Sequence, residues 1–220
     1  MENLTSSYAL NKKNKCDGMK LLLSTKSESI ATAFFDPQYR SILDKLRYGN
    51  EGQGRSRERC SLPQMNESAI ISFIKEIDRV LIKSGHLFLW IDKFCLCEGV
   101  ADWFTGTDLH IVDLFVWDKK TFGLGWRSRH VCEFLLVCQK SPVRVKGCWS
   151  DHTIRDLWDE KVIKTHPHSK PVELQRRLIA STTKDGDIVL DPASGGYSVF
   201  EACKLLNRDF LGSDICYGND

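Results

Sequence analysis

Two aspartates near the C-terminal end flank a turn that contains glycine. Asp191 follows the short apolar run 188–190, and Ala193-Ser194-Gly195-Gly196 come next. Asp214 follows a second apolar run, about twenty residues beyond the turn. Glycines let a backbone approach a ligand closely, and a carboxylate at a strand end accepts hydrogen bonds from ribose hydroxyls. The pattern is typical of half of a nucleotide-binding sheet, although a purely structural strand-turn-helix gives the same pattern.

A second group of chemistry-bearing residues lies far upstream. Asp36-Pro37-Gln38-Tyr39 directly follows the apolar run 30–35, which predicts a buried strand ended by Asp-Pro. A carboxylate and a carbonyl oxygen can accept hydrogen bonds from an amino group, and an aromatic ring can stack on a base. Taken alone, the segment is equally a common strand-ending turn.

A third segment lies between these two groups in the sequence and leads into the one near the C-terminal end. Residues 166–174 read His-Pro-His-Ser-Lys-Pro-Val-Glu-Leu, and the chain then runs through Asp187 into the strand that ends at Asp191. Pro171 is well placed to begin a helix with Leu174 and Leu178 on its inner face. By itself, this segment predicts a polar loop followed by a helix.

The elements that position these residues alternate between strands and helices. Asn66 is expected to cap a helix with Ile70, Ile74, Ile77 and Leu81 on its apolar face, ended by Gly85. Such alternation predicts a doubly wound, mostly parallel α/β sheet, whose strands meet their ligands at their carboxyl ends. Further strands are predicted at 86–91, 111–117, 132–138 and 210–212, and a further helix after the turn at 193–196.

Composition sets the remaining limits. The 220 residues have 42% apolar side chains and a net charge of only +2, so they suit one α/β domain rather than a strongly basic protein. Nine cysteines lack metal-ligand spacing, so we expect reduced thiols and no metal site. No apolar run reaches membrane-spanning length, which favours a cytoplasmic protein that does not contact a membrane.

Together the motifs resemble the β group of amino-methylating DNA methyltransferases, in which the catalytic motif precedes the cofactor motif. Residues 166–179 (HPHSKPVELQRRLI) and 186–198 (GDIVLDPASGGYS) resemble that family's HPxxKPxxLxxxxI and GDxVLDPFxGSGTT, and residues 36–39 resemble its DPPY. The run from Trp117 to Glu133 resembles its W-K and R-HE segment. Gln38, Ala193 and Tyr197 stand where the family has Pro, Phe and Gly.

The resemblance implies a circularly permuted, seven-stranded, Rossmann-like methyltransferase sheet in one domain spanning residues 1–220. It also implies S-adenosylmethionine as the cofactor and double-stranded DNA as the substrate. Asp36 and the Pro37 carbonyl would hold the target amino group beside Gln38, and Tyr39 would stack on the flipped base. Asp214 would take the ribose hydroxyls, Asp17 and Gly18 would face the adenine ring, and Lys170, Ser194, Gly195 and Ser198 would line the methionine end. The implied cofactor-binding set is Asp17, Gly18, Lys170, Asp191, Ala193, Ser194, Gly195, Gly196, Ser198 and Asp214.

Basic residues near the expected target pocket are candidates for phosphate contacts. The sequence predicts a mobile basic loop over residues 40–65 and a short recognition-like insert over 139–165, with a twin or partner subunit completing DNA recognition. Each of these charges could equally be a solvated surface residue. The DNA-contacting candidates are Arg40, Lys45, Arg47, Arg55, Arg57, Arg59, Arg127, Arg129 and His130.

Asp36 favours N6 of adenine as the target, since DPPY-like motifs go with adenine and SPPY-like motifs with N4 of cytosine. Cytosine N4 is one alternative, and a DNA-binding homologue that needs a partner or has lost turnover is another. A nicotinamide-dependent enzyme would leave Asp36 and the 166–171 segment without a role.

Overall fold

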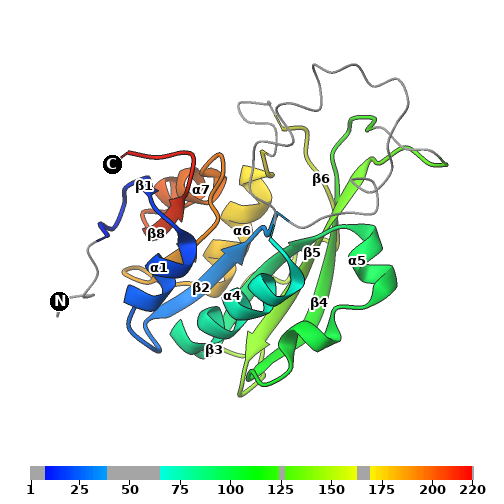
Figure 1. The fold of residues 1–220 in the computed structure, drawn as a ribbon. Helices are drawn as coiled ribbons and strands as arrows, with labels where there is room; N and C mark the ends of the chain where they lie inside the picture. Colours follow the sequence, from blue (N-terminus) through cyan, green and yellow to red (C-terminus); the bar gives the residue numbers. More distant parts are fainter. Residues whose placement is uncertain (1–7, 39–64, 124–126, 163–168, 220) are drawn as a thin grey trace.

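The computed structural model describes residues 8–38, 65–123, 127–162 and 169–219, and its central feature is one twisted sheet (Figure 1). Its eight strands lie in the order β1-β8-β7-β2-β3-β5-β4-β6. Neighbours from β1 to β3 are parallel, β5 is antiparallel to both β3 and β4, and β6 is parallel to β4. The strands are β1 (Asn14–Lys15), β2 (Ile30–Phe35), β3 (Leu81–Ile91), β4 (Leu109–Asp118), β5 (Cys132–Lys140), β6 (Leu157–Asp159), β7 (Ile188–Asp191) and β8 (Asp209–Asp214).

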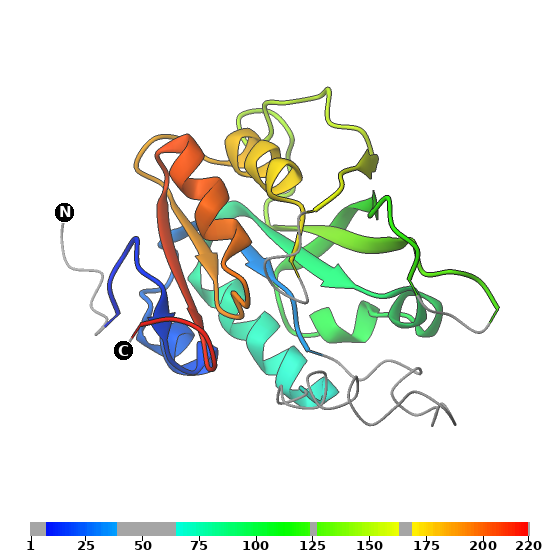
Figure 2. The ribbon, with the colours of Figure 1, turned by 90° about the horizontal axis from the view of Figure 1, so that it is seen from above.

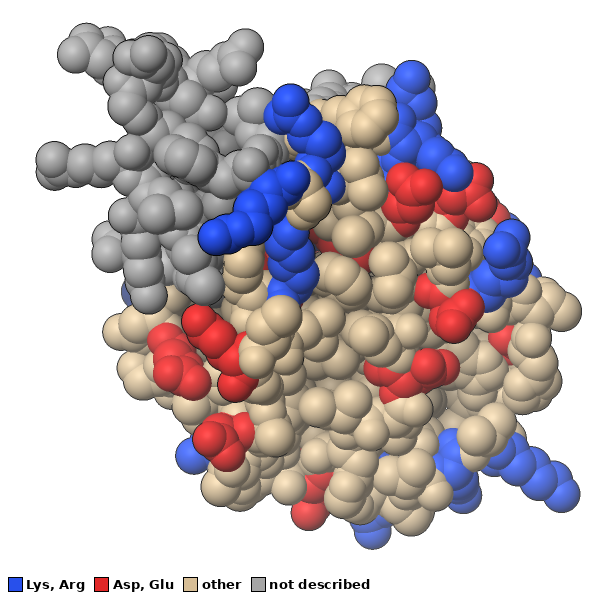
Figure 3. Space-filling view, turned by 90° about the vertical axis from the view of Figure 1, so that its right-hand side faces the viewer, with Lys and Arg blue, Asp and Glu red and all other residues tan. Residues whose placement is uncertain are grey.

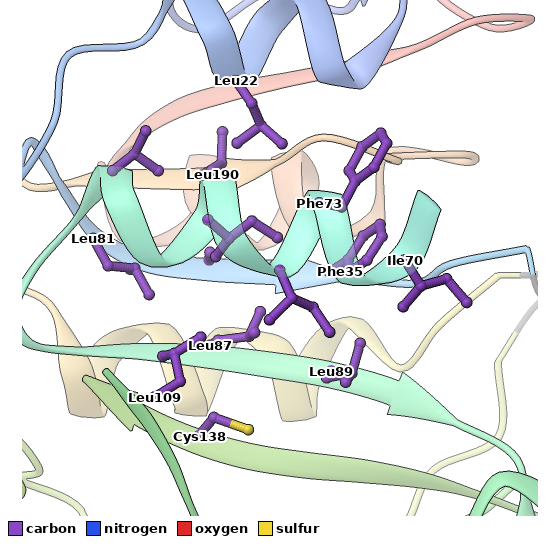
Figure 4. Close-up of a cluster of buried hydrophobic side chains, with 14 of the residues drawn as sticks. Leu22, Phe35, Ile70, Phe73, Leu81, Leu87, Leu89, Leu109, Cys138 and Leu190 are labelled. Atoms are coloured by element: carbon purple, nitrogen blue, oxygen red, sulfur yellow. The ribbon is translucent and has the colours of Figure 1, made fainter. Parts of the chain in front are cut away.

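Helices cover both faces of the sheet, as the alternating pattern predicts (Figures 1 and 2). One apolar layer joins α1, α4 and η1 to the sheet, and Figure 4 shows Phe73 of α4 stacked on Phe35 of β2, 5.1 Å between ring centroids. The opposite layer joins α6 and α7 to Phe34 and Phe88. The helices are α1 (Gly18–Ser24), α4 (Glu67–Val80), α5 (Lys93–Glu98), η1 (Ala101–Phe104), α6 (Val172–Thr182) and α7 (Ser198–Leu206).

The permuted order of the sheet is visible in one strand pair. Thr32 of β2 lies opposite Val189 of β7, although the two strands are far apart in the sequence. From this pair the chain continues to β3 on one side and to β8 on the other, so the carboxyl ends of β2 and β7 form a switch point. Ligands of doubly wound sheets bind in the crevice at such a point.

The doubly wound, mostly parallel fold class is confirmed, with eight strands in the described residues instead of the seven predicted. Apolar runs placed six of the eight strands, and the two that they did not place are short edge segments: β1 has two residues and β6 has three. Segments this short carry too little apolar periodicity to be recognised in a sequence. Pairing with the edges of β8 and β4 is what defines them.

The predicted end of the helix capped by Asn66 is wrong. The side chain of Asn66 accepts from the N–H of Ala69 at 2.8 Å as expected, but α4 ends at Val80 and Leu81 is already extended. A bulge lets Leu81 pair with Ile30, so β3 begins before Gly85. Gly85 fits there because a Cβ would lie 2.9 Å from the carbonyl oxygen of Ala31.

The predicted mobile basic loop over residues 40–65 and the predicted recognition-like insert over residues 139–165 both stay predictions. Most of the basic loop over residues 40–65 lies outside the described residues. Of the insert over 139–165, the first two residues complete β5, β6 lies within it, and the described part ends at residue 162. Among the described residues, no helix is long and apolar enough to cross a membrane.

Candidate active site

A cavity of about 440 Å³ opens at the carboxyl ends of β2, β7 and β8. Most of its polar lining comes from strand ends and the turns that follow them, which is where the sequence places the candidate residues. Asp36 and Gln38 line it, Pro37 is buried beside them, and Tyr39 lies outside the described residues. All ten predicted cofactor residues line it as well: Asp17, Gly18, Lys170, Asp191, Ala193, Ser194, Gly195, Gly196, Ser198 and Asp214.

Lys170 links Asp36 to Glu133, which the sequence named only as the end of a family-like segment and not as a site residue. Its Nζ lies 3.0 Å from Oδ2 of Asp36 and 2.7 Å from Oε2 of Glu133. Burial would lower the pKa of Lys170, but the two carboxylates outweigh burial and raise it. The lysine, which lines the cavity, is therefore a cation fixed between two anions. The prediction that it lines the methionine end is not tested by these contacts.

Glu133 is held by two lysines. Besides Lys170, it contacts Lys119, whose Nζ is 3.3 Å from Oε1. Burial would raise the pKa of Glu133, but the two ammonium groups outweigh that effect and hold it at about 2. Glu133 opens β5, opposite Trp117 of β4, so the sheet itself brings it next to the Asp36 strand end.

Asp191 lies deeper, at the end of β7. It is 5% exposed, and its Oδ1 accepts from the N–H of Ala193 at 3.3 Å. Burial raises the pKa of Asp191 to about 8, against the Ala193 hydrogen bond and with further contributions from Asp36 and Asp214. This carboxyl is consequently protonated at neutral pH in the free protein, and a cation placed nearby would favour its ionised form.

Asp214 organises the glycine turn. Its Oδ2 accepts from the N–H of Gly195 at 3.0 Å, and its Oδ1 accepts from the N–H groups of Cys216 and Tyr217 at 2.8 and 2.9 Å. Three backbone donors therefore fix the carboxylate at the rim of the cavity. Oδ1 already accepts two hydrogen bonds, whereas Oδ2 accepts one and keeps a lone pair for a ligand hydroxyl.

Asp17 and Gly18 follow β1, which pairs with β8, so they lie beside Asp214 and the turn after β7. Asp17 caps α1 by accepting from the N–H of Met19 at 2.8 Å, which fixes the chain direction at that point. A Cβ on Gly18 would lie 2.0 Å from the carbonyl oxygen of Pro192. Only glycine lets α1 approach the turn after β7 this closely.

Trp90 of β3 and Gln175 of α6 also line the cavity, and sequence reasoning missed both. The Lys170 ammonium lies 4.8 Å from the Trp90 ring centroid, within reach of a cation–π interaction. The Trp90 Nε1 and the Gln175 Oε1 are buried without a hydrogen-bond partner in the described residues. The only sequence signals for these two cavity residues are the position of Trp90 within an apolar strand and the position of Gln175 in the helix that follows Pro171.

The predicted DNA-contacting residues fall in two places. Arg127, Arg129 and His130 lie in the connection between β4 and β5, at the same edge of the sheet as Asp36, and both arginines are exposed. Figure 3, which views the molecule from the right-hand side of Figure 1, shows several lysine and arginine side chains in its upper part, with acidic side chains beside them. Burial, with Lys93 and Lys119 adding to it, lowers the pKa of His130, so it is neutral at neutral pH. The remaining candidates, Arg40, Lys45, Arg47, Arg55, Arg57 and Arg59, lie outside the described residues.

A doubly wound sheet with a cavity at its switch point, lined by strand-end aspartates and a glycine turn, is the architecture of the α/β proteins that bind nucleotides. The family described as DNA methylase, covering N6 and N4 methyltransferases, matches residues 31–216. The chain is 52% identical to the type II methyltransferase M.HhaII of Haemophilus parahaemolyticus, over 96% of this chain and 93% of that protein.

Solved structures agree on the fold. The cytosine-N4-specific PvuII DNA methyltransferase superposes with a TM-score of 0.70 at 16% identity, covering 92% of this chain and 81% of that one. The complex of M1.HpyAVI with S-adenosylmethionine gives a TM-score of 0.64 at 18% identity, covering 92% of both chains. The chain thus belongs to the N6/N4 family of DNA methyltransferases, whose methyl donor is S-adenosylmethionine.

Proposed function

We propose that this enzyme moves a methyl group from S-adenosylmethionine to N6 of adenine in double-stranded DNA. The observation that carries the proposal is the position of Asp36. Its carboxylate stands at the rim of the cavity, paired with Lys170 at 3.0 Å, directly beside the turn that follows Asp191. An acceptor for an amino group therefore adjoins the site expected for the methyl donor.

The cavity residues fit S-adenosylmethionine by their chemistry. The ligand carries a positive sulfonium and an ammonium group, and Asp36, Asp191 and Asp214 provide acidic groups around the same cavity. Asp214 is proposed to take the ribose hydroxyls, and Asp17 with Gly18 to face the adenine ring. The pairing of β1 with β8 brings these residues close together on the cavity lining, as the adjoining ribose and adenine require. Ser194, Gly195, Gly196 and Ser198 belong to the turn and the start of α7, where the backbone can approach the methionine part. When bound, S-adenosylmethionine supplies an electrophilic methyl group.

The residues of the chain make the target nitrogen reactive. The lone pair of an adenine amino group is delocalised into the ring, so the nitrogen is a poor nucleophile. Asp36 and the Pro37 carbonyl accept hydrogen bonds from the N–H groups of this amino group. These bonds orient the amino group and localise its lone pair on nitrogen. Fixed acceptors also stabilise the positive charge that grows on nitrogen, and holding both partners in place removes much of the entropic barrier. Tyr39 is proposed to stack on the flipped base.

Adenine is proposed over cytosine because an aspartate begins the catalytic motif. The matching segment of the family has Asp in DPPY-like motifs and Ser in SPPY-like motifs, and this chain has Asp36. A second subunit, either a twin or a partner, is proposed to complete recognition of the DNA sequence. Mass measurement of the protein in solution, with and without DNA, tests that part separately.

The decisive experiment is transfer of labelled methyl from S-adenosylmethionine to mixed-sequence DNA, with the modified base identified by mass. Asp36→Ala is expected to abolish transfer while still binding the cofactor. Asp113→Ala, an exposed aspartate in β4 outside the cavity, is the matched control and should retain activity. N4-methylcytosine as the product would show that the target base is cytosine and not adenine. If the wild type binds the cofactor but transfers no methyl group, a partner-dependent or non-catalytic homologue would be favoured.

A further inference from the structure

Glu133 is the other anion beside the Lys170 ammonium. The Lys170 Nζ lies 2.7 Å from Glu133 Oε2 and 3.0 Å from Asp36 Oδ2, so the lysine is at least as close to Glu133 as to Asp36. The three side chains come from three separate places: the end of β2, the start of β5 and the residue two before α6. Their meeting is a property of the fold and not of local sequence.

The Lys170 ammonium has little freedom to move. Its side chain is 12% exposed, and the Trp90 ring lies 4.8 Å from Nζ, so the cation is enclosed by an aromatic face and two carboxylates. Glu133 is itself fixed from its far side by Lys119 at 3.3 Å. The Glu133 carboxylate therefore sets where the ammonium rests, and the ammonium sets where the Asp36 carboxylate points.

A single lysine beside Asp36 would work against the proposed chemistry. Without Glu133, the Lys170 ammonium would donate its hydrogen bonds to Asp36. Those bonds would occupy the carboxylate and weaken it as an acceptor for an amino group. The ammonium would also place a positive charge beside a nitrogen that becomes positive during the transfer. A second carboxylate on the same ammonium offsets both effects, because it takes some of the hydrogen bonds and balances the charge.

We infer that Glu133 is a positioning residue for catalysis: it holds and neutralises Lys170 so that Asp36 stays oriented and available as the acceptor for the target amino group. The inference rests on the proposed function, since it assigns Asp36 that role. It adds an acidic residue from β5 to the strand-end aspartates of β2, β7 and β8. Glu133 acts through Lys170 and does not touch the substrate.

The first test separates turnover from cofactor binding. Glu133→Gln keeps the shape and removes the charge, and its kcat for DNA methylation at saturating substrates is expected to fall roughly 10- to 100-fold. The dissociation constant for S-adenosylmethionine is expected to stay close to that of wild type, whereas the thermal midpoint should fall because two lysines stabilise the ionised Glu133 in the folded protein. Glu133→Asp retains the charge and should recover at least half of the loss on a logarithmic scale. Glu173→Gln, an exposed glutamate paired with Arg176 on α6, makes the same charge change away from the cavity.

Three results would overturn the inference: a kcat within about twofold of wild type for Glu133→Gln, a loss in kcat matched by an equal loss in cofactor affinity, or no recovery in Glu133→Asp. The same assay on wild type reports on the proposed function by itself. If wild type methylates no DNA, the proposed function fails before any Glu133 variant is considered.

A second measurement needs neither turnover nor a Glu133 variant. In protein labelled with ¹⁵N-lysine, an enclosed ammonium should give a resonance protected from solvent exchange, assigned to Lys170 by its absence in Lys170→Met. If Glu133 holds Lys170 independently, this resonance persists in Asp36→Asn. Its disappearance in Asp36→Asn would show that Asp36 alone fixes the lysine and would contradict the inference.

Discussion

The hydroxyl oxygen of Tyr197 lies 2.8 Å from the backbone carbonyl oxygen of Asn14 and 3.0 Å from that of Tyr217. Tyr197 stands where the resemblance places a glycine of the cofactor turn, and its backbone keeps a left-handed conformation with φ of 59°. Its side chain is 2% exposed, does not line the cavity, and packs edge-on against Phe210. The turn thus keeps its glycine-like shape while the ring fastens β1 and the C-terminal segment to the sheet.

Tyr197→Phe should lower stability. The change removes the only hydroxyl that reaches the two carbonyl oxygens among the described residues, and a lost buried hydrogen bond costs about 1–2 kcal/mol in unfolding free energy. Urea unfolding of the variant beside wild type measures the difference. Methyl transfer at saturating cofactor should be unchanged, because the ring does not line the cavity. Equal unfolding midpoints would show that the hydroxyl contributes nothing to stability.

Asp214→Asn should weaken cofactor binding. In asparagine, an NH2 group replaces one of the two carboxylate oxygens that accept from Gly195, Cys216 and Tyr217. That NH2 group then faces a backbone N–H group, and because both are donors the turn rearranges. We expect the dissociation constant for S-adenosylmethionine to rise about 10- to 100-fold, which corresponds to loss of one or two charge-assisted hydrogen bonds. Titration calorimetry gives this value directly.

For that variant, Asp209→Asn at the opposite end of β8 is the control, since its carboxylate contacts Asn11 outside the cavity. An unchanged cofactor affinity in Asp214→Asn, with a stable fold, would remove Asp214 from the binding site.

Residues that carry local signals were predictable from the sequence. Strand and helix periodicity placed Asp36 and Asp191 at strand ends, and parallel strands then had to bring them to one edge. The cap at Asn66 was equally local, because side-chain oxygens of this kind accept from the first turn of a helix. The fold class followed from such signals, whereas the ten cofactor candidates that line the cavity were named mainly through the family resemblance of their motifs.

The partners of Lys170 were not predictable in this way. Glu133 reaches Lys170 through antiparallel pairing of β5 with β3 and β4, and nothing in the local sequence around either residue encodes that register. The early end of α4 was missed for a similar reason: Leu81 fits an apolar helix face as well as a buried strand, and pairing with Ile30 decides between them. Long-range pairing settles what local patterns leave open.

Asp191 should give the protein a distinctive pH dependence. In the folded chain its pKa is raised from 3.8 to about 8, so it stays protonated where the unfolded chain is ionised. The stability that the protonated carboxyl contributes is complete below pH 3.8 and is lost as the pH rises towards about 8. Asp191→Asn keeps an acceptor for the Ala193 N–H and cannot ionise. Between pH 5 and pH 8.5 the wild type should lose roughly 4 kcal/mol of unfolding free energy that the variant keeps, so the thermal midpoint of the variant relative to wild type should rise by roughly 10 °C.

The same raised pKa predicts proton release on cofactor binding. A sulfonium or ammonium group near Asp191 would favour the ionised carboxyl, so binding at neutral pH should expel part of a proton. Calorimetric titrations in buffers with different ionisation enthalpies measure that release. Asp191→Asn should lose it, and an identical release from variant and wild type would assign the proton to another group.

The connection between β4 and β5 should contribute to DNA binding through charge alone. Arg127 and Arg129 are exposed there, at the edge of the sheet that holds Asp36. The affinity of a protein for DNA depends less steeply on salt concentration for each phosphate contact that is removed. For Arg127→Ala/Arg129→Ala we expect weaker binding to all DNA sequences and a salt-dependence slope reduced by about 2. Lys83→Ala, an exposed lysine near the amino end of β3, is the matched control on the opposite edge and should leave the slope unchanged. A slope unaltered in the double variant would show that this connection does not contact the phosphates, and would leave the basic residues before Met65 as the candidates to test next.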